Sequence, residues 1–223
     1  YYSKLCLVQM AHPGNTEDSA VLIDPLSPDL SLDPLYELFK NPNVVKVFHA
    51  ARQDLEIFFI DKKIIPFPFF DTQVAAMVCG FGEQVGYEKL VRSICNEGLD
   101  KSSRFTDWSA RPLSNKQMHY AIGDVTYLRE IYEFLSNKIK DNKRQAWVEE
   151  ELKILMDPET YIIDPKYAWR RVKTRSSSWK MLAAIAELAM FREKYAQQKN
   201  IPRNRVYKDD CMMELAATRP KSL

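Results

Sequence analysis

Residues 44–56 read VVKVFHAARQDLE, in which a run of β-favouring residues leads directly into a helical pattern. Valine and phenylalanine favour strands, and apolar residues recur at helical spacing over residues 51–60. Open α/β sheets bind ligands beyond the carboxyl ends of their strands, and Asp54 follows such a strand, early in its helix. The stretch therefore predicts an α/β fold with a carboxylate at its functional edge. The alternative is an acid that only benefits from the helix dipole.

Short strands and helices flank this stretch, with strands early in the chain and helices dominating later. Strands are expected at residues 5–10 and 20–23, where β-rich runs are bounded by turn-forming residues. Asp33-Pro34 predicts a helix start, with Asp33 as the N-cap and Pro34 in the first helical position. Apolar residues at helical spacing predict further helices at residues 72–79, 87–95, 114–131, 145–155, 179–198 and 209–217.

Charge divides the chain into two parts, although its net charge is only +2. Residues 1–165 hold 18 Lys and Arg against 25 Asp and Glu, a net charge of −7. Residues 166–223 hold 14 basic and 5 acidic residues, a net charge of +9. These charges favour a basic module for a polyanion beside an acidic module that can bind cations.

The composition, with 46% hydrophobic and 28% charged residues, is typical of a globular protein. No apolar stretch approaches the roughly 18 residues that indicate a membrane span, so no membrane partner is expected. The four cysteines are scattered without a CxxC pair and predict packed, reduced thiols. Because no secretion leader opens the sequence, a cytoplasmic location is expected. Nothing in the sequence demands a multimer, so we expect a monomer.

Tyr120 and Asp124 are a candidate catalytic pair on one helix. Ser114 and Gln117 have the spacing of a capping box and predict where this helix begins. Residues four apart share a helical face, so the phenol and the carboxylate can point into the same cleft. The carboxylate would bind a hard divalent cation through oxygen, and the phenol would orient a water molecule. A buried ring beside a solvated acid is the alternative.

The order of several motifs gives this pair a context. From Tyr1 to about Arg144 the chain resembles the exonuclease domain of ribonuclease D, in the DEDD superfamily of 3′-to-5′ exonucleases. The stretches that carry the resemblance are YSKLCLVQ (2–9), IDPL (23–26), KVFHA (46–50) with DLE (54–56), FDTQ (70–73), GYEKLV (86–91), DWSARPL (107–113) and YAIGDVTYL (120–128).

The resemblance implies a ribonuclease H-like mixed sheet flanked by helices, forming an α/β exonuclease domain over residues 1–144. It implies that Asp54 is the acid of the second motif and that Tyr120 and Asp124 form the third, Tyr-containing motif. Asp54 and Asp124 would then be metal ligands. Two divalent metal ions, Mg²⁺ or Mn²⁺, would act on the terminal phosphodiester and release nucleoside 5′-monophosphates.

Residues 166–223 resemble the helical HRDC domain, a nucleic-acid-binding module that follows the exonuclease domain in this family. The matching residues are FRE (191–193), IPRNR (201–205) and KD (208–209), and residues 145–165 form a linking helix and linker. We expect this all-α domain to be truncated at its C-terminus. Its predicted role agrees with the charge of +9, and basic residues that could neutralise phosphates are Arg170, Arg171, Lys173, Arg175 and Lys180. A solvated surface is their alternative role.

Two further residues precede the catalytic helix and are candidates for nucleic-acid binding. Trp108 could stack on a base and Arg111 could bind a phosphate. A buried tryptophan beside a structural Arg-Pro turn is the alternative.

His119 introduces a choice within the third motif, because the superfamily uses either Tyr-x-x-x-Asp or His-x-x-x-x-Asp. His119 precedes Asp124 by five residues, so both spacings are present. On an ideal helix a four-residue spacing leaves two side chains about 40° apart, and a five-residue spacing about 140° apart. The geometry and the family resemblance both favour Tyr120.

The family's first motif, an Asp-x-Glu shortly before the stretch that matches Tyr1-Tyr2-Ser3-Lys4, does not occur in this sequence. We expect that the chain is a fragment of a longer protein and is inactive by itself. The predicted function is that of a 3′-to-5′ exoribonuclease acting on tRNA precursor 3′ ends and other structured RNA. The alternatives are an inactive exonuclease fold that binds nucleic acid and a 3′-to-5′ exonuclease directed at DNA.

Overall fold

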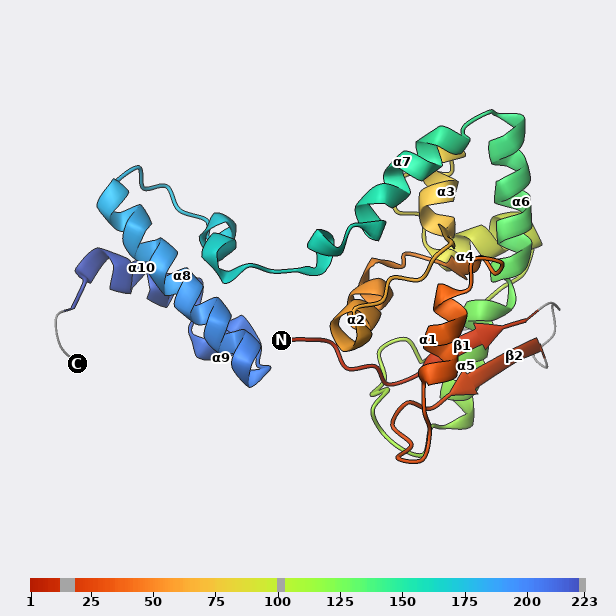
Figure 1. Cartoon of the computed structure of the whole chain (residues 1–223), viewed down its shortest axis with the longest axis horizontal. Coiled ribbons are helices and arrows are strands. Elements are labelled where there is room, and N and C mark those ends of the chain that lie inside the picture. Colours follow the sequence, from red (N-terminus) through yellow and green to blue (C-terminus); the bar gives the residue numbers. More distant parts are fainter. Residues whose placement is uncertain (13–18, 100–102, 221–223) are drawn as a thin grey trace. The chain divides into compact units, whose positions relative to one another are not determined.

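The computed structural model describes residues 1–12, 19–99 and 103–220, which form two compact units. One unit is Leu5–Pro158, and the other combines Tyr1–Lys4 with Glu159–Leu223. The first unit contains the strands and most of the helices, and the second is helical (Figure 1). The predicted end of the HRDC domain, at residues 221–223, lies outside the described residues.

The strands of the first unit pair in both orientations. β1 (Val8–Ala11) runs antiparallel to β2 (Ala20–Ile23), with Val8 opposite Ile23. β3 (Lys46–Phe48) runs parallel to β4 (Phe69–Asp71), so that Phe48 lies opposite Asp71. Within the described residues these pairs form two two-stranded sheets. The strand β4 was missing from the sequence prediction, because its three residues give too short a pattern to recognise.

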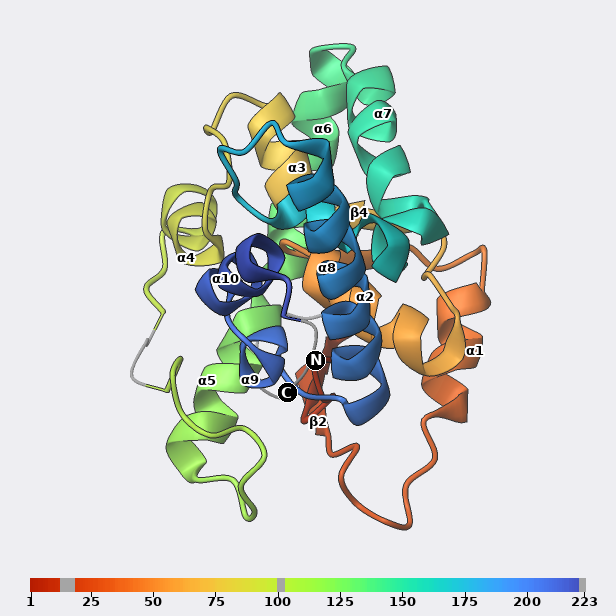
Figure 2. The same cartoon turned by 90° about the vertical axis from the view of Figure 1, so that its left-hand side faces the viewer.

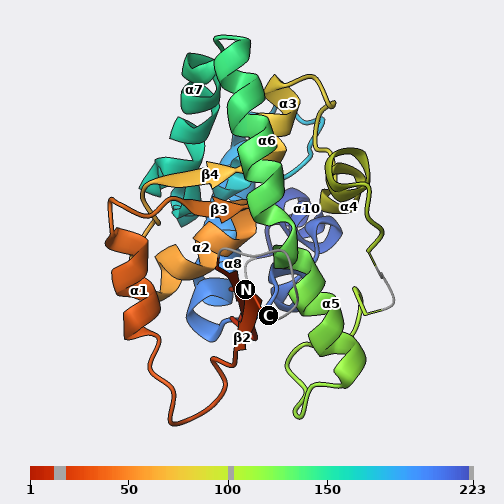
Figure 3. The same cartoon turned by 90° about the vertical axis from the view of Figure 1, so that its right-hand side faces the viewer.

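Helices pack around these strands. They are α1 (Asp33–Lys40), α2 (Arg52–Lys62), α3 (Thr72–Val78), α4 (Tyr87–Leu90) with a π-helical turn over Val91–Cys95, α5 (Asn115–Thr126), α6 (Leu128–Asp141) and α7 (Gln145–Met156). Figure 3 shows α6 crossing the β3–β4 pair, and α6 contacts β3. The sequence prediction of Asp33 as an N-cap was wrong, because the carbonyl of Leu32 accepts the N–H of Tyr36 and the helix begins one residue earlier.

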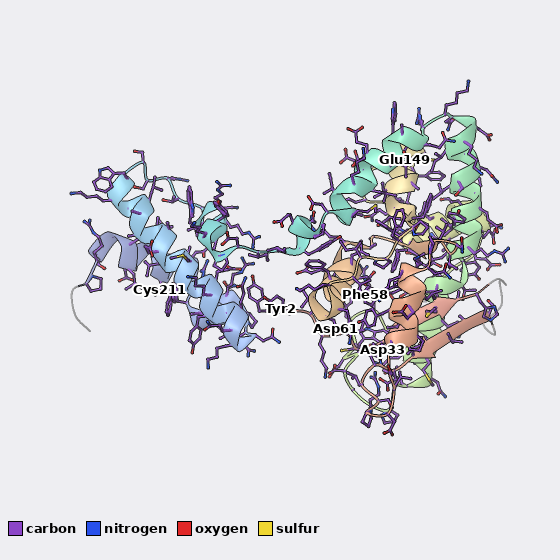
Figure 4. The ribbon with its side chains drawn as sticks, viewed as in Figure 1. Tyr2, Asp33, Phe58, Asp61, Glu149 and Cys211 are labelled. Carbon is purple, nitrogen blue, oxygen red and sulfur yellow. The ribbon has the colours of Figure 1, made fainter. Side chains whose placement is uncertain are left out.

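A cluster of buried aromatic and aliphatic side chains joins α1 and α2 to β1. Phe58, labelled in Figure 4, points from α2 toward α1, and its ring centroid lies 4.7 Å from that of Phe39. Leu35, Tyr36 and Val8 complete the buried set. This packing fixes α2, and therefore Asp54, against the strands.

The single helix expected over residues 114–131 is two helices, α5 and α6, which divide at Tyr127. The hydroxyl of Thr126 donates to the carbonyl of Ile122 at 2.8 Å, and the N–H of Tyr127 donates to the hydroxyl of Tyr87 at 3.2 Å. Such side-chain bonds compete with the backbone bonds of a continuous helix. The division therefore follows from a contact 40 residues away in the sequence.

The second unit consists of two 3₁₀ turns, η3 (Pro158–Tyr161) and η4 (Pro165–Arg171), and the helices α8 (Trp179–Lys199), α9 (Arg203–Val206) and α10 (Asp209–Thr218). Figure 2 shows α8 with α9 and α10 beside it, and their contacts bury Ile185, Ala189 and Met212. The prediction of an all-α C-terminal domain is confirmed.

Residues at the start of the chain belong to this helical unit. The Tyr1 hydroxyl is hydrogen-bonded to the buried carboxylate of Glu193, and the N–H of Tyr2 donates to Asn200 Oδ1 at 2.9 Å. The helix α7 packs against α3 and belongs to the first unit, which extends to Pro158. The domain limits at 144 and 166 stay a prediction.

All four cysteines are free thiols, as expected. Cys211, labelled in Figure 4, is exposed, so the prediction that every cysteine is packed was wrong. Cys211 precedes Met212, which is buried in the core together with Ala216 of the same helix. Within the described residues, no helix combines the length and the apolar character needed to cross a membrane.

Candidate active site

The helix α5 brings Tyr120 and Asp124 together. Its start is fixed by a capping box, in which Gln117 N–H donates to Ser114 Oγ at 3.3 Å and Ser114 N–H donates to Gln117 Oε1 at 3.0 Å. The Tyr120 hydroxyl donates a hydrogen bond to the Asp124 carboxylate. The two side chains therefore lie on one face of α5, as their spacing indicates.

Burial dominates the electrostatics of this pair. It raises the pKa of Asp124 from 3.8 to about 6, while the Tyr120 hydrogen bond and the positive charge of Arg104 act in the opposite direction. Burial also raises the pKa of Tyr120, and the negative charge of Asp124 adds to that shift. Asp124 is thus a carboxylate whose negative charge is incompletely compensated by its surroundings.

Asp54 lies in the first turn of α2, just beyond the carboxyl end of β3. Its side chain is open to solvent, yet the surrounding protein desolvates the carboxylate and raises its pKa to about 6. The negative charge of Asp71 contributes to this shift. Asp54 has no hydrogen-bond donor or cation partner among the residues that the structure describes. Its negative charge is therefore available to a ligand.

Asp71 has a structural role that the sequence analysis did not assign. Its buried carboxylate, 1% exposed, caps α3 by accepting the N–H groups of Gln73 at 2.8 Å and Val74 at 3.3 Å. It also accepts the N–H groups of Ala50 at 3.1 Å and Ala51 at 2.8 Å, which lead into α2. An acid directly between a β-rich run and a helix was the available sequence signal. Asp71 holds the turn that positions Asp54.

His49 and Tyr87 connect this edge of the β3–β4 pair to α5. The His49 ring contacts Thr72 Oγ1 through Nδ1 at 2.9 Å, and its centroid lies 5.6 Å from that of Tyr87. Burial raises the pKa of Tyr87, and the charge of Asp124 adds to this effect. Tyr87 thus lies beside His49, which follows β3, and within electrostatic range of Asp124 on α5.

Of the two nucleic-acid-binding candidates that precede α5, Trp108 lies beside the Tyr120–Asp124 pair. Its ring centroid is 5.9 Å from that of Tyr120, with the planes tilted by 42°. Trp108 is partly buried. The structure thus places it next to the catalytic candidate, and its contact with nucleic acid stays a prediction.

The second candidate, Arg111, is held by hydrogen bonds within the protein. Its Nε and Nη2 each donate to the Asp24 carboxylate at 2.6 Å, and Nη2 also donates to the carbonyl of Cys6 at 2.6 Å. Its Nη1 donates to the carbonyls of Trp108 at 3.0 Å and Ala110 at 2.8 Å. All five N–H donors of the guanidinium are thus occupied by protein acceptors. This geometry gives no support to the predicted phosphate contact.

His119 and the basic residues of the second unit are exposed. His119 lies on α5, and the hydroxyl that bonds Asp124 belongs to Tyr120. The predicted phosphate-binding residues of the helical unit are all open to solvent, namely Arg170, Arg171, Lys173, Arg175 and Lys180. Arg170 lies over the ring of Tyr167, with its guanidinium carbon 4.6 Å from the centroid. These residues are accessible, and their binding role stays a prediction.

The donors fit a hard divalent cation in kind. Asp54 and Asp124 offer carboxylate oxygens, which Mg²⁺ and Mn²⁺ prefer, and their charges are not fully compensated within the protein. Among the described residues, no group of three or more His, Cys, Asp or Glu side chains is arranged to bind a metal. The residues present therefore supply two candidate ligands.

Comparison with known proteins identifies the class. Residues 1–140 match the family described as 3′-5′ exonuclease, and residues 181–223 match the HRDC domain. The chain belongs to the 3′-5′ exonuclease family.

Within that family, the resemblance to ribonuclease D is confirmed. Ribonuclease D of Jannaschia sp. (strain CCS1) is 62% identical over all 223 residues of the chain, which cover 58% of that protein. The crystal structure of Escherichia coli RNase D, described as an exoribonuclease involved in structured RNA processing, superposes with a TM-score of 0.88 at 30% identity. It aligns with 100% of this chain, which covers 58% of that structure. The chain thus spans little more than half the length of these relatives.

A more distant structure with a similar fold has been solved with ligands. Brucella melitensis NrnC aligns with 78% of this chain at a TM-score of 0.62, and has been solved with bound Mg²⁺ and with bound pGG. The chain covers 83% of the Mg²⁺-bound structure and 82% of the pGG-bound one, at identities of 24% and 26%. The fold is thus one in which a relative has been solved with a divalent cation.

Proposed function

We propose that this protein is a metal-dependent 3′-5′ exoribonuclease that removes terminal nucleotides from tRNA precursors and other structured RNA. The observation that carries the proposal is the Tyr120–Asp124 pair, a hydroxyl bonded to a desolvated carboxylate on the face of α5. Asp54, at the end of β3, is a second carboxylate without a compensating donor in the described part of the chain. The similarity to proteins named ribonuclease D supports RNA as the substrate class.

Asp54 and Asp124 would hold two divalent metal ions, Mg²⁺ or Mn²⁺. Such ions, when bound, lower the pKa of a water molecule and neutralise charge on a phosphodiester. The Tyr120 hydroxyl, which donates to Asp124, would orient the attacking water. Hydrolysis at the last phosphodiester releases a nucleoside 5′-monophosphate. In this mechanism the chain provides the two carboxylates, of Asp54 and Asp124, and the phenol of Tyr120.

The exposed cations of the helical unit would bind RNA phosphates outside the reaction centre. Arg170, Arg171 and Lys173 precede α8, and none of them is buried. Contacts to phosphate supply affinity that depends on salt and is independent of sequence. A cytoplasmic monomer remains the predicted state of the protein.

An assay of strand cleavage tests this function. The protein expressed from its complete reading frame is incubated with 5′-labelled RNA and DNA, with Mg²⁺, Mn²⁺ or EDTA, so that shortening from the 3′ end is visible. We expect stepwise shortening of RNA with either metal and none in EDTA. Cleavage of DNA alone would support a DNA exonuclease, and cleavage of neither would support a binding protein.

Two neighbouring substitutions separate the catalytic roles. Tyr120→Phe removes the hydroxyl and keeps the ring, so we expect kcat to fall by about 100-fold or more. His119→Ala, one residue away on the exposed side of α5, is the matched control and should retain activity. The reverse result would assign the third motif to His119.

A further inference from the structure

The turn over residues 103–106 projects two side chains that the proposed reaction does not use. The carbonyl of Ser103, which is buried, accepts Thr106 Oγ1 at 2.8 Å and Thr106 N–H at 3.3 Å. Arg104 and Phe105 occupy the tip between them. Phe105 is 91% exposed, the highest fraction among the exposed large apolar side chains that the structure describes. A ring so open to water offers a face on which a nucleic-acid base can stack.

This turn is hydrogen-bonded to α5, the helix that carries Tyr120 and Asp124. Gln117 Nε2 donates to Thr106 Oγ1 and to the carbonyl of Asp107, both at 3.2 Å. Gln117 lies on α5, one helical turn before Tyr120, and its side chain is nearly buried. Farther along the same segment, Trp108 packs against Tyr120 at 5.9 Å between ring centroids. The tip of the turn is therefore held at a fixed place beside the candidate active site.

Arg104 gives the tip of the turn a positive charge. Its guanidinium carbon lies 5.3 Å from the centroid of the Phe105 ring. Its charge acts on both Tyr120 and Asp124, so it lies within electrostatic range of the pair. Within the described residues Arg104 forms no direct ion pair with a carboxylate, although its charge acts on Asp124. The cation is thus available for a phosphate group close to the reaction centre.

We propose that Arg104 and Phe105 form a binding element for the 3′-terminal segment of the RNA, in which Phe105 stacks on a base and Arg104 binds a neighbouring phosphate. The proposal rests on the proposed exoribonuclease function and names how its site holds the strand. Aromatic stacking combined with an arginine is a general mode of binding single strands, since every base has a π-face. A stacked base also covers the exposed ring of Phe105, and the positive charge of Arg104 over this ring favours nucleic acid over an apolar protein partner.

The test measures kcat and KM with a 5′-labelled single-stranded RNA, using the protein from its complete reading frame. Phe105→Ala should raise KM by about 5- to 100-fold, the usual effect of losing one stacked base, with kcat changed less than about twofold. Phe105→Tyr, which keeps a ring, should restore KM. Arg104→Gln should raise KM and flatten the dependence of log KM on log salt concentration by about 0.7, the value for one phosphate contact on a single strand.

A matched control is available on α7. Trp147 is 58% exposed, and the guanidinium carbon of Arg144 lies 5.1 Å from the centroid of its ring, as in the Arg104–Phe105 pair. In Figures 1 and 3, α7 lies at the opposite end of the unit from α5. Trp147→Ala should leave both kcat and KM unchanged. Because Phe105 is exposed, its variants should melt within about 1 °C of the unaltered protein.

The outcomes separate this inference from the function on which it rests. If the unaltered protein cleaves RNA and Phe105→Ala leaves KM unchanged, the binding element is wrong and the exoribonuclease stands. If the unaltered protein cleaves nothing, the proposed function is wrong. In that case, fluorescence anisotropy of a labelled RNA in EDTA decides the element alone. A Kd that rises for Phe105→Ala and recovers for Phe105→Tyr supports it, and an unchanged Kd overturns it.

Discussion

Replacing Asp124 with asparagine should stabilise the metal-free protein at neutral pH, even though it removes a candidate catalytic group. The pKa of Asp124 in the folded protein is about 6, against 3.8 without the fold. A raised carboxyl pKa contributes stability in full below the unfolded value, and this contribution is lost as the pH rises through the folded value. Above about pH 6 the ionised side chain is therefore a cost that a neutral asparagine does not have.

The size of this effect follows from the shift. Two pKa units at about 1.4 kcal/mol each set an upper limit of about 3 kcal/mol. Asp124 is only partly buried, so screening by solvent reduces the expected gain to about 1–2 kcal/mol. The asparagine oxygen can still accept the Tyr120 hydrogen bond, so no donor is left unpaired. The gain should be present at about pH 7.5 and absent at about pH 3.5.

Urea unfolding of both proteins in EDTA, followed by circular dichroism across this pH range, measures the difference. Adding Mg²⁺ at about pH 7.5 should stabilise the unaltered protein more than the variant and narrow the gap, since a ligand stabilises only the state that binds it. A variant that is less stable at neutral pH in EDTA, or a gain that persists at about pH 3.5, would refute the reasoning from desolvation.

Three further substitutions test other parts of the structure. Asp71→Asn should lower the free energy of unfolding, measured in urea, by about 2–4 kcal/mol, because an amide cannot accept all four N–H groups. It should also lower the pKa of Asp54, measured by NMR, and an unchanged pKa of Asp54 would contradict the effect of the Asp71 charge. Gln117→Ala should lower the free energy of unfolding by about 1–2 kcal/mol, because it removes the capping box, and should also raise KM for RNA. A loss of stability with an unchanged KM would show that Gln117 acts only in capping the helix. Tyr1→Phe should cost about 1–3 kcal/mol, because it removes the hydroxyl that donates to the buried Glu193. Unaltered thermal unfolding of the helical unit would show that this bond is dispensable.

The parts of the site that could be predicted from the sequence are those that depend on local spacing. The capping box of Ser114 and Gln117 and the shared face of Tyr120 and Asp124 both lie within one helix. Their geometry is set by the helical repeat and needs no information on distant residues. The position of Asp54 after a strand was likewise a local pattern.

The parts that could not be predicted depend on contacts between distant segments. The hydroxyl of Tyr87 ends α5 at Tyr127, and the short strand β4 forms by pairing with β3. The guanidinium of Arg111 is occupied by Asp24, 87 residues away in the sequence. In each case a side chain or strand from elsewhere decides which of two plausible local readings is realised. Local sequence patterns therefore do not reveal which of the two is realised.

Asp54, Asp71 and Asp124 show how the same side chain acquires opposite roles. Asp71 is almost completely buried, and four backbone N–H groups compensate its charge, so it stabilises the fold. Asp124 has only the hydroxyl of Tyr120, and Asp54 has no donor in the part of the chain that the structure describes. Desolvation raises the pKa of both to about 6, because one hydroxyl offsets it only partly at Asp124 and no donor in the described residues offsets it at Asp54, so their ionised forms are unfavourable. A bound divalent cation would remove this cost, so metal binding at the proposed site and the stabilisation predicted for Asp124→Asn would have the same physical origin.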